Sequence, residues 1–258
     1  MPQIHLHAEP GDYANVVLLP GDPNRATRIA ARFDGGLESA RLVNEHRGLL
    51  GYTGVVEGVP VSVQTTMMGT PTTSIVVEEL LMLGATTFIR VGTTGGYPGT
   101  NIGDAVIALA AAANTGVGRV LGFGEATAPT ADFEVVLALV DAVKATGQSY
   151  HVGPIVTGDY FYDPTPGGST RWASRGYLSA EMEAAALFLI CMRERAKGRP
   201  VRAGCILTVS DVMRADASDA AVGHEAWFRP HEDEVTKAVD VTVGAALAAA
   251  AALGRSAV

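Results

Sequence analysis

Short apolar runs alternate with longer amphipathic segments along the whole chain, and each kind has a length typical of one type of element. The runs that predict buried strands are Val16–Leu19, Val61–Thr66, Phe88–Val91, Ala105–Ala110 and Val201–Ser210. The segments that predict helices are Asn24–Phe33, Ser74–Leu83, Phe133–Ala145 and Glu232–Leu253. This alternation predicts an α/β fold, and in such folds ligands bind outside the carboxyl ends of the strands.

The composition predicts one folded domain over residues 1–258, because 48% of the residues are hydrophobic and only 18% are charged. No repeat or linker divides the chain, although the segment Asn114–Thr130 predicts a mobile excursion. The Ala-rich run Val243–Leu253 is shorter than the ~20 residues that a membrane helix needs. Because no signal peptide is visible and Cys191 and Cys205 cannot form a disulfide framework, we expect a cytoplasmic protein without a membrane partner.

The net charge of −8 argues against a surface that follows the phosphates of nucleic acid. The chain contains no G-x-x-x-x-G-K-[ST] phosphate loop, no H-E-x-x-H zinc helix, no C-x-x-C pair and no G-x-S-x-G nucleophile turn. Its six histidines are scattered without a cluster that has metal-ligand spacing, and Gly92–Gly96 lacks the dinucleotide fingerprint. We therefore expect neither a metal nor a resident cofactor.

Two segments combine a glycine turn with an arginine and are candidates for binding an anion. Leu19–Arg25 places the turn at a strand end and Arg25 in the first turn of a helix, which is a typical anion site. The alternative is an ordinary turn with a solvated arginine. Phe88–Gly96 contains Arg90 within an apolar run, where a guanidinium needs a partner. That partner is either a bound anion or an internal salt bridge.

A third candidate is formed by Glu181, Met182 and Glu183, at the predicted start of a helix that runs to Ile190. Carboxylates can accept hydrogen bonds from the vicinal hydroxyls of a sugar. The alternative is a charged helix start that the helix dipole favours, without any ligand.

Taken together, these segments resemble the nucleoside phosphorylase family, which contains the hexameric bacterial purine nucleoside phosphorylases and the uridine phosphorylases. The resemblance rests on motifs in family order: His5 with Gly11–Asp12, Leu19–Pro23 with Arg25, His46–Gly48, Ile89–Gly95, Glu181–Glu183 and Thr208–Asp211. It implies a single α/β domain with a twisted central mixed sheet flanked by helices. It also implies a homo-oligomer, a hexamer built as a trimer of dimers, whose active sites are shared between neighbouring subunits.

The resemblance also implies a role for each matching residue. Phosphate, the co-substrate, would be bound by Gly21, Arg25, Arg90 and Thr93 together with Arg47 of the partner subunit. The nucleoside would be bound by Phe161, Glu181, Met182, Glu183 and Ser210 together with His5 of the partner subunit. Glu183 would accept hydrogen bonds from the sugar hydroxyls, Phe161 would stack on the base, and Asp211 would protonate the purine at N7.

The residues alone leave purely structural interpretations open for three of these positions. Without the family pattern, His5 fits a frayed terminal residue, Phe161 fits a core aromatic, and Asp211 fits a turn former at a strand end.

The choice of base depends on a few positions of the pattern. Asp211 after Ser210 is the purine-type residue, whereas Thr93–Thr94 is more similar to uridine phosphorylases. Uridine enzymes typically carry a glutamine and an arginine where this chain has Thr165 and Gly167. The sequence therefore favours phosphorolysis of purine (deoxy)ribonucleosides, with uridine phosphorolysis as the alternative. It leaves the preference among inosine, guanosine and adenosine open.

The chain departs from the purine enzymes at His224, thirteen residues after Asp211, where those enzymes have an assisting arginine. Arg214, three residues after Asp211, is our candidate for a second catalytic residue. Two other classes stay open: a nucleosidase that uses water, and a nucleoside-binding protein without activity. The three arginines of the phosphate site argue against the first class, and the retention of Asp211 argues against the second.

Overall fold

The computed structural model describes residues 2–162, 168–213 and 232–256. Its strands are β1 (Val16–Leu19), β2 (Arg41–Asn44), β3 (Gly51–Val56), β4 (Val59–Gln64), β5 (Thr87–Gly96), β6 (Ala105–Asn114), β7 (Tyr150–Gly158), β8 (Ser179–Glu181) and β9 (Arg202–Val212). Its helices are α1 (Pro23–Ala30), α2 (Thr70–Met82), α3 (Gly116–Leu121), α4 (Phe133–Thr146), α5 (Gly168–Ala173), α6 (Ala184–Ala196) and α8 (Glu232–Arg255), with a short 3₁₀ turn η1 (His46–Gly48).

The strands form one nine-stranded sheet in the order β2-β3-β4-β1-β5-β8-β7-β6-β9. Because β9 also pairs with β5, the strands β5, β8, β7, β6 and β9 close into a ring. The pairs β1–β5, β5–β9 and β6–β7 are parallel, whereas β3–β4 and β6–β9 are antiparallel. The predicted mixed sheet is therefore confirmed, and β5 is its central strand.

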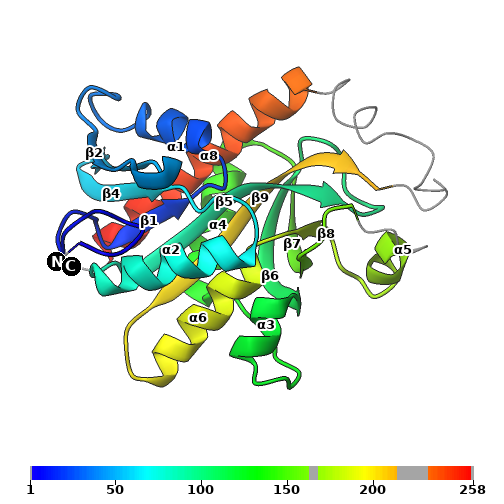
Figure 1. Ribbon diagram of the computed structural model, residues 1–258. Helices are drawn as coiled ribbons and strands as arrows, with labels where there is room; N and C mark the ends of the chain where they lie inside the picture. The colour runs from blue at the N-terminus through cyan, green and yellow to red at the C-terminus, as the bar shows by residue number, and fades with distance from the viewer. Residues whose placement is uncertain (1, 163–167, 214–231, 257–258) are drawn as a thin grey trace.

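Helices cover both faces of this sheet (Figure 1). α2 and α6 lie on one face, where their side chains share a core with Phe88 of β5. α1, α4 and α8 share the core on the other face, which contains Ile89 of the same strand. Neighbouring residues of β5 thus point into opposite layers, as the period-2 geometry of a strand requires. The α/β class predicted from the alternation is confirmed.

The helix α8 is 24 residues long and is apolar enough, by length and composition, to cross a membrane. It packs against α4 and the strands β1, β4 and β9, and 56% of its most apolar window is buried inside the protein. Burial of this kind is typical of the core helix of a soluble protein.

Several boundaries differ from the prediction for local reasons. α1 begins directly after Asp22, whose side chain caps the helix by accepting a hydrogen bond from the Asn24 amide at 2.9 Å. α2 begins at Thr70 rather than at the predicted Ser74, because a proline is tolerated in the first turn of a helix. The segment 114–130, expected to be a mobile excursion, contains the helix α3.

The two largest differences concern segments that carry predicted site residues. Gly92–Gly96, expected to be a turn, continues β5, because β8 and β9 flank it and pair with its backbone. Glu181 ends the strand β8 rather than beginning a helix, and Glu183 takes the N-cap position of α6. Both differences depend on pairing with distant strands, which local composition does not reveal.

Candidate active site

β1 and β5 bring the two predicted anion-binding segments together. Their parallel register pairs Leu19 with Arg90, two residues before the turn glycine Gly21. A Cβ on Gly21 would lie 3.0 Å from the backbone oxygen of Met67, so this turn is packed too closely for a side chain. The tertiary structure therefore places the glycine turn, at the carboxyl end of β1, close to Arg90.

Arg25 reaches from α1 to β5, where a guanidinium nitrogen donates to the carbonyl oxygen of Val91 at 3.4 Å. Among the described residues it has no carboxylate partner. Burial, and then the positive charge of Arg90, lower the pKa of Arg25 below its usual value. A partly buried guanidinium without a carboxylate partner is a candidate for binding an anion.

Arg90 lies in the middle of β5 and is only 5% exposed. Its Nε donates to Glu181 Oε2 at 2.8 Å, and its Nη2 forms an ion pair with Glu183 Oε2 at 2.5 Å. Burial opposes the charge, but the two carboxylates outweigh it and raise the pKa of Arg90 above its usual value. The internal salt bridge, one of two partners that the sequence left open, is therefore present. Because a guanidinium has five N–H donors, this arrangement leaves donors for an anion, and Thr93 lies half-buried further along the strand.

Glu181 is surrounded by donors from the protein itself. Its oxygens accept hydrogen bonds from the Arg90 guanidinium, the Thr157 hydroxyl, the Glu183 amide at 2.9 Å and the Ala184 amide at 3.0 Å. Because these amides open α6, the carboxylate also neutralises the positive end of that helix. In this structure Glu181 orients Arg90 and the start of α6, and its predicted contact with a nucleoside stays a prediction.

Glu183, at the N-cap of α6, is 4% exposed and is held from two sides. Its Oε1 accepts a hydrogen bond from the Gly69 amide at 2.6 Å, and its Oε2 faces Arg90. Burial raises the pKa of Glu183 above its usual value, although Arg90 opposes the shift. A carboxylate with one protein donor on each oxygen keeps lone pairs for further hydroxyl groups. Met182, beside it, is half-buried.

The predicted acid Asp211 lies near the end of β9, beside an irregularity in its pairing with β5. Thr94 pairs with Val209 but Gly95 pairs with Asp211, so Ser210 is an extra residue in β9. The Ser210 hydroxyl donates to Asp211 Oδ1 at 2.7 Å. The structure thus brings Ser210 and Asp211 together in one hydrogen-bonded pair.

Three consecutive aromatic side chains project from the protein after β7. Tyr160, Phe161 and Tyr162 are each more than half exposed, with Phe161 at 65%. The rings of Phe161 and Tyr162 meet edge to face, with their centroids 5.0 Å apart. The interpretation of Phe161 as a core aromatic is therefore wrong.

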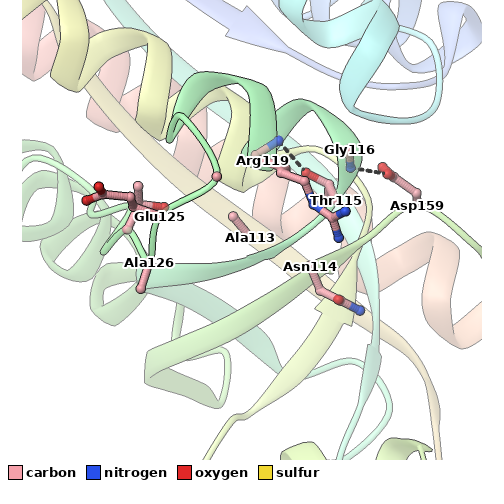
Figure 2. Close-up of a pocket in the computed structure, with 11 residues that line it drawn as sticks. Ala113, Asn114, Thr115, Gly116, Arg119, Glu125, Ala126 and Asp159 are labelled. Atoms are coloured by element: carbon pink, nitrogen blue, oxygen red, sulfur yellow. Dashed lines mark hydrogen bonds between the residues drawn. The ribbon is translucent and has the colours of Figure 1, made fainter.

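Asp159 anchors the start of this aromatic segment. Its Oδ1 accepts a hydrogen bond from the Thr70 hydroxyl at 2.9 Å. Its Oδ2 accepts one from the Gly116 amide at 2.6 Å, which Figure 2 shows. Thr70 directly follows Gly69, whose amide binds Glu183. Two neighbouring residues at the start of α2 therefore hold both Asp159, which precedes the aromatic segment, and the buried Glu183.

A polar cavity of about 450 Å³ adjoins Asp159 (Figure 2). The turn between β6 and α3 and the segment 124–127 line it, with Asn114, Arg119 and Glu125 among its polar side chains. Of the predicted site residues that the structure describes, none lines this cavity. It is a separate hollow beside the aromatic segment rather than the predicted site.

His5 and Arg47 have no hydrogen bond or ion pair with the Arg90 cluster within the described residues. His5 is held on α2, where its Nδ1 lies 2.7 Å from Glu79 Oε1 and its amide donates to the same carboxylate, so it is not a frayed end. Arg47 is exposed in η1 with a φ of 58°, a conformation that is strained for a residue with a side chain. Its side chain has no polar partner in the described part of the chain.

Some predicted positions cannot be placed. Arg214, His224, Thr165 and Gly167 lie outside the described residues. Where the chain is described, no group of three or more His, Cys, Asp or Glu side chains could hold a metal ion.

Four supporting residues were not predicted from the sequence: Gly69, Glu79, Thr157 and Asp159. Each makes its contact with a residue far away in the sequence, so no local motif marks it. Only Asp159 carried a signal, because it directly precedes the aromatic segment.

Residues 15–251 match the sequence model of the Phosphorylase superfamily, and the chain belongs to this family. The resemblance found in the sequence is therefore confirmed.

Curated relatives that share one functional name match most of the chain. A purine nucleoside phosphorylase of DeoD type from Clostridium perfringens is 37% identical over 246 residues, which cover 95% of this chain and 98% of the relative. A protein of the same name from Exiguobacterium sibiricum is 42% identical over 227 residues, covering 87% and 93%. Another from Geobacillus kaustophilus is 40% identical over 210 residues, covering 81% and 85%.

Proposed function

We propose that this protein uses inorganic phosphate to cleave the N-glycosidic bond of purine (deoxy)ribonucleosides, which yields the free base and (deoxy)ribose 1-phosphate. The observation that carries the proposal is the buried Arg90, held between two carboxylates with the Arg25 guanidinium close by. This arrangement puts an anion subsite directly beside Glu183, which can accept hydrogen bonds from sugar hydroxyls. The names of the three relatives above support the same activity.

Phosphate is both ligand and nucleophile in the proposed mechanism. Its ligands are the Gly21 amide, Arg25, Arg90, the Thr93 hydroxyl and Arg47 of the partner subunit. The paired guanidinium groups of Arg25 and Arg90 repel each other, so a bound phosphate relieves that repulsion. Bidentate contacts from arginine also fix the direction in which a phosphate oxygen points.

The sugar is held while one bond forms and another breaks. Glu183 accepts hydrogen bonds from the 2′ and 3′ hydroxyls, Met182 packs on the ring, and His5 of the partner subunit meets the 5′ hydroxyl. A phosphate oxygen forms a bond to C1′ as the C1′–N9 bond breaks. The electron pair of the C1′–N9 bond moves into the base. The positive charge that develops on the sugar is stabilised by the phosphate.

The base leaves as a neutral molecule when it gains a proton. Asp211 donates that proton to N7, an atom that both 6-oxo and 6-amino purines have, and Phe161 stacks on the ring. Arg214 is the candidate that assists Asp211. Thr93–Thr94, which is more similar to uridine phosphorylases, keeps uridine as the second candidate substrate.

The proposal includes a cytoplasmic homo-oligomer, a hexamer of three dimers. The exposed, strained Arg47, which has no polar partner in the described part of its own chain, supports a site that is shared with a partner subunit. The mechanism uses only phosphate and protein groups, so it needs no metal or resident cofactor and no nucleic acid or membrane partner. The two buried, free cysteines suit a reducing compartment.

The test is release of free base from inosine, adenosine and uridine, each with and without inorganic phosphate. Phosphate-dependent release from the purine nucleosides is the expected result. Release from uridine alone would assign the protein to the second candidate, and release without phosphate would overturn the role of the arginines. No release from any nucleoside would indicate binding without catalysis.

A further inference from the structure

The extra residue in β9 changes which way the predicted acid faces. In a regular strand, successive side chains alternate between the two faces of the sheet. One inserted residue reverses this alternation for every position after it, so the bulge at Ser210 decides the face from which Asp211 projects. Bulges commonly re-aim a side chain next to an active site.

Ser210 itself is buried at 6% exposure, and its hydroxyl has two acceptors within reach. It lies 2.7 Å from Asp211 Oδ1 and 3.3 Å from the Thr94 carbonyl oxygen of β5. One hydroxyl donates one proton, so the shorter contact with the carboxylate is the stronger hydrogen bond. Ser210 therefore holds Oδ1 in place from inside the sheet.

The second carboxylate oxygen of Asp211 lies over a position without a side chain. A Cβ added to Gly95 would stand 3.3 Å from Asp211 Oδ2 and 2.6 Å from the Met213 terminal methyl. Gly95 also pairs with Ala180 of β8, the residue directly before Glu181. Gly95 thus lies between β8, which leads to Glu183, and β9, which carries Asp211.

We propose that Ser210 is a positioning residue for Asp211, and that the missing side chain at Gly95 provides the space in which Asp211 turns toward the purine N7. The inference rests on the proposed function, because it requires Asp211 to donate a proton to the leaving base. It gives Ser210 a role that acts through Asp211 rather than through direct contact with the nucleoside.

The test uses a substrate whose base needs no proton. A purine nucleoside methylated at N7 already carries the positive charge that protonation of N7 would create. For Ser210→Ala and for Gly95→Ala we expect kcat with inosine to fall about tenfold or more, since positioned general acids contribute about 10²–10⁴-fold. We expect kcat with 7-methylinosine to stay within about twofold of the wild-type value, because its cleavage bypasses the proton transfer.

Two matched variants control for the substitutions themselves. Gly158→Ala adds a methyl group at the end of β7, where nothing lies within 4 Å of the new Cβ. Ser174→Ala removes an exposed hydroxyl that donates to the Arg171 carbonyl oxygen. Both controls should leave the two rates unchanged.

The outcomes separate the inference from the function on which it rests. Wild-type protein that releases no base from inosine with phosphate would overturn the proposed function. Active wild-type protein with unchanged inosine turnover in both variants would overturn the inference alone. A parallel fall of both rates in the variants would also overturn it, because that indicates general damage to the site.

Discussion

Arg90 and Arg47 are predicted to bind the same phosphate, yet the fold treats them in opposite ways. Arg90 lies in the central strand, is 5% exposed and is held by two carboxylates. Arg47 is exposed in a 3₁₀ turn, with a φ of 58°. The difference shows that the Arg90 side chain is fixed by contacts within the chain, whereas the Arg47 side chain has no polar contact in the described part of the chain.

Substitution of the buried Arg90 should have the largest effect on both stability and activity. Arg90→Met would leave Glu181 and Glu183 buried without their cation, so we expect the free energy of unfolding to fall by about 3–5 kcal/mol. Phosphorolysis should fall by about 10²–10³-fold, because a fixed charge at the reacting anion is lost. Urea unfolding and base release measure the two effects.

A matched control for Arg90 is Arg28→Met, which breaks an exposed ion pair with Asp240. Exposed pairs contribute about 0–1 kcal/mol, so both measurements should change little. An Arg90→Met protein as stable as the wild type would contradict a stabilising role of Arg90 between Glu181 and Glu183.

Substitution of the exposed Arg47 should weaken phosphate binding without lowering the free energy of unfolding. Arg47→Gly removes the charge and supplies a residue that tolerates positive φ, so the free energy of unfolding should stay level or rise by up to about 1 kcal/mol. The KM for phosphate should rise about tenfold or more, since a charge-assisted hydrogen bond contributes about 1.5–3 kcal/mol. Glu57→Gly, at another positive-φ position, should relieve strain without changing this KM. An unchanged phosphate KM in Arg47→Gly would remove Arg47 from the site.

Phe161, which we predict to stack on the base, is exposed like Arg47 and should also affect binding rather than stability. Because it is 65% exposed, Phe161→Ala should change the free energy of unfolding by no more than about 0.5 kcal/mol. The KM for nucleoside should rise about tenfold, since stacking of a base on an aromatic contributes about 1–3 kcal/mol. Phe123→Ala, at a 94% exposed position, is the control and should leave this KM unchanged. A clear loss of stability without a change in KM would point to a structural role instead.

An ion-pair network outside the site should affect stability and leave activity unchanged. Hydrogen bonds from Lys197, Arg199 and Arg193 lower the pKa of Glu194 to about 2 from its usual 4.5. A lowered pKa stabilises the fold above pH 4.5, and this contribution disappears as the pH falls toward 2.

Glu194→Gln should therefore lower the free energy of unfolding by about 1–2 kcal/mol at pH 7, allowing for the solvent exposure of its partners. The difference from the wild type should shrink at pH 3, and base release should not change. Urea unfolding at both pH values checks this. A difference that is as large at pH 3 as at pH 7 would mean that packing, not charge, is lost.

Much of the site could be predicted because its residue types are unusual where they stand. An arginine in an apolar strand requires a partner, and Arg90 has two carboxylates as partners. Gly21 and Arg25 follow the first strand in the arrangement typical of an anion site, and Asp22 caps the helix between them. These are consequences of local chemistry, so they can be found without coordinates.

The supporting contacts could not be predicted in the same way. The Gly69 amide reaches Glu183 across 114 positions of sequence, and the Thr70 hydroxyl reaches Asp159 across 89. Glycines at 92–96 suggested a turn, but pairing with β8 and β9 makes them strand. A backbone amide or a threonine carries no sign of a partner that only the folded chain brings near.

The amino-acid sequence by itself determined the α/β class, the burial of the arginine-bearing strand and the segments in which the candidate chemistry lies. Each of these follows from periodicity and from the free energy of burying charge, which act over a few residues. Only the tertiary structure decided that β5 to β9 close into a ring, that Glu181 serves Arg90 and α6, and that a bulge turns Asp211. These features depend on strand register and on contacts between distant segments, and the free energy of such contacts belongs to the assembled sheet rather than to any one part of the chain.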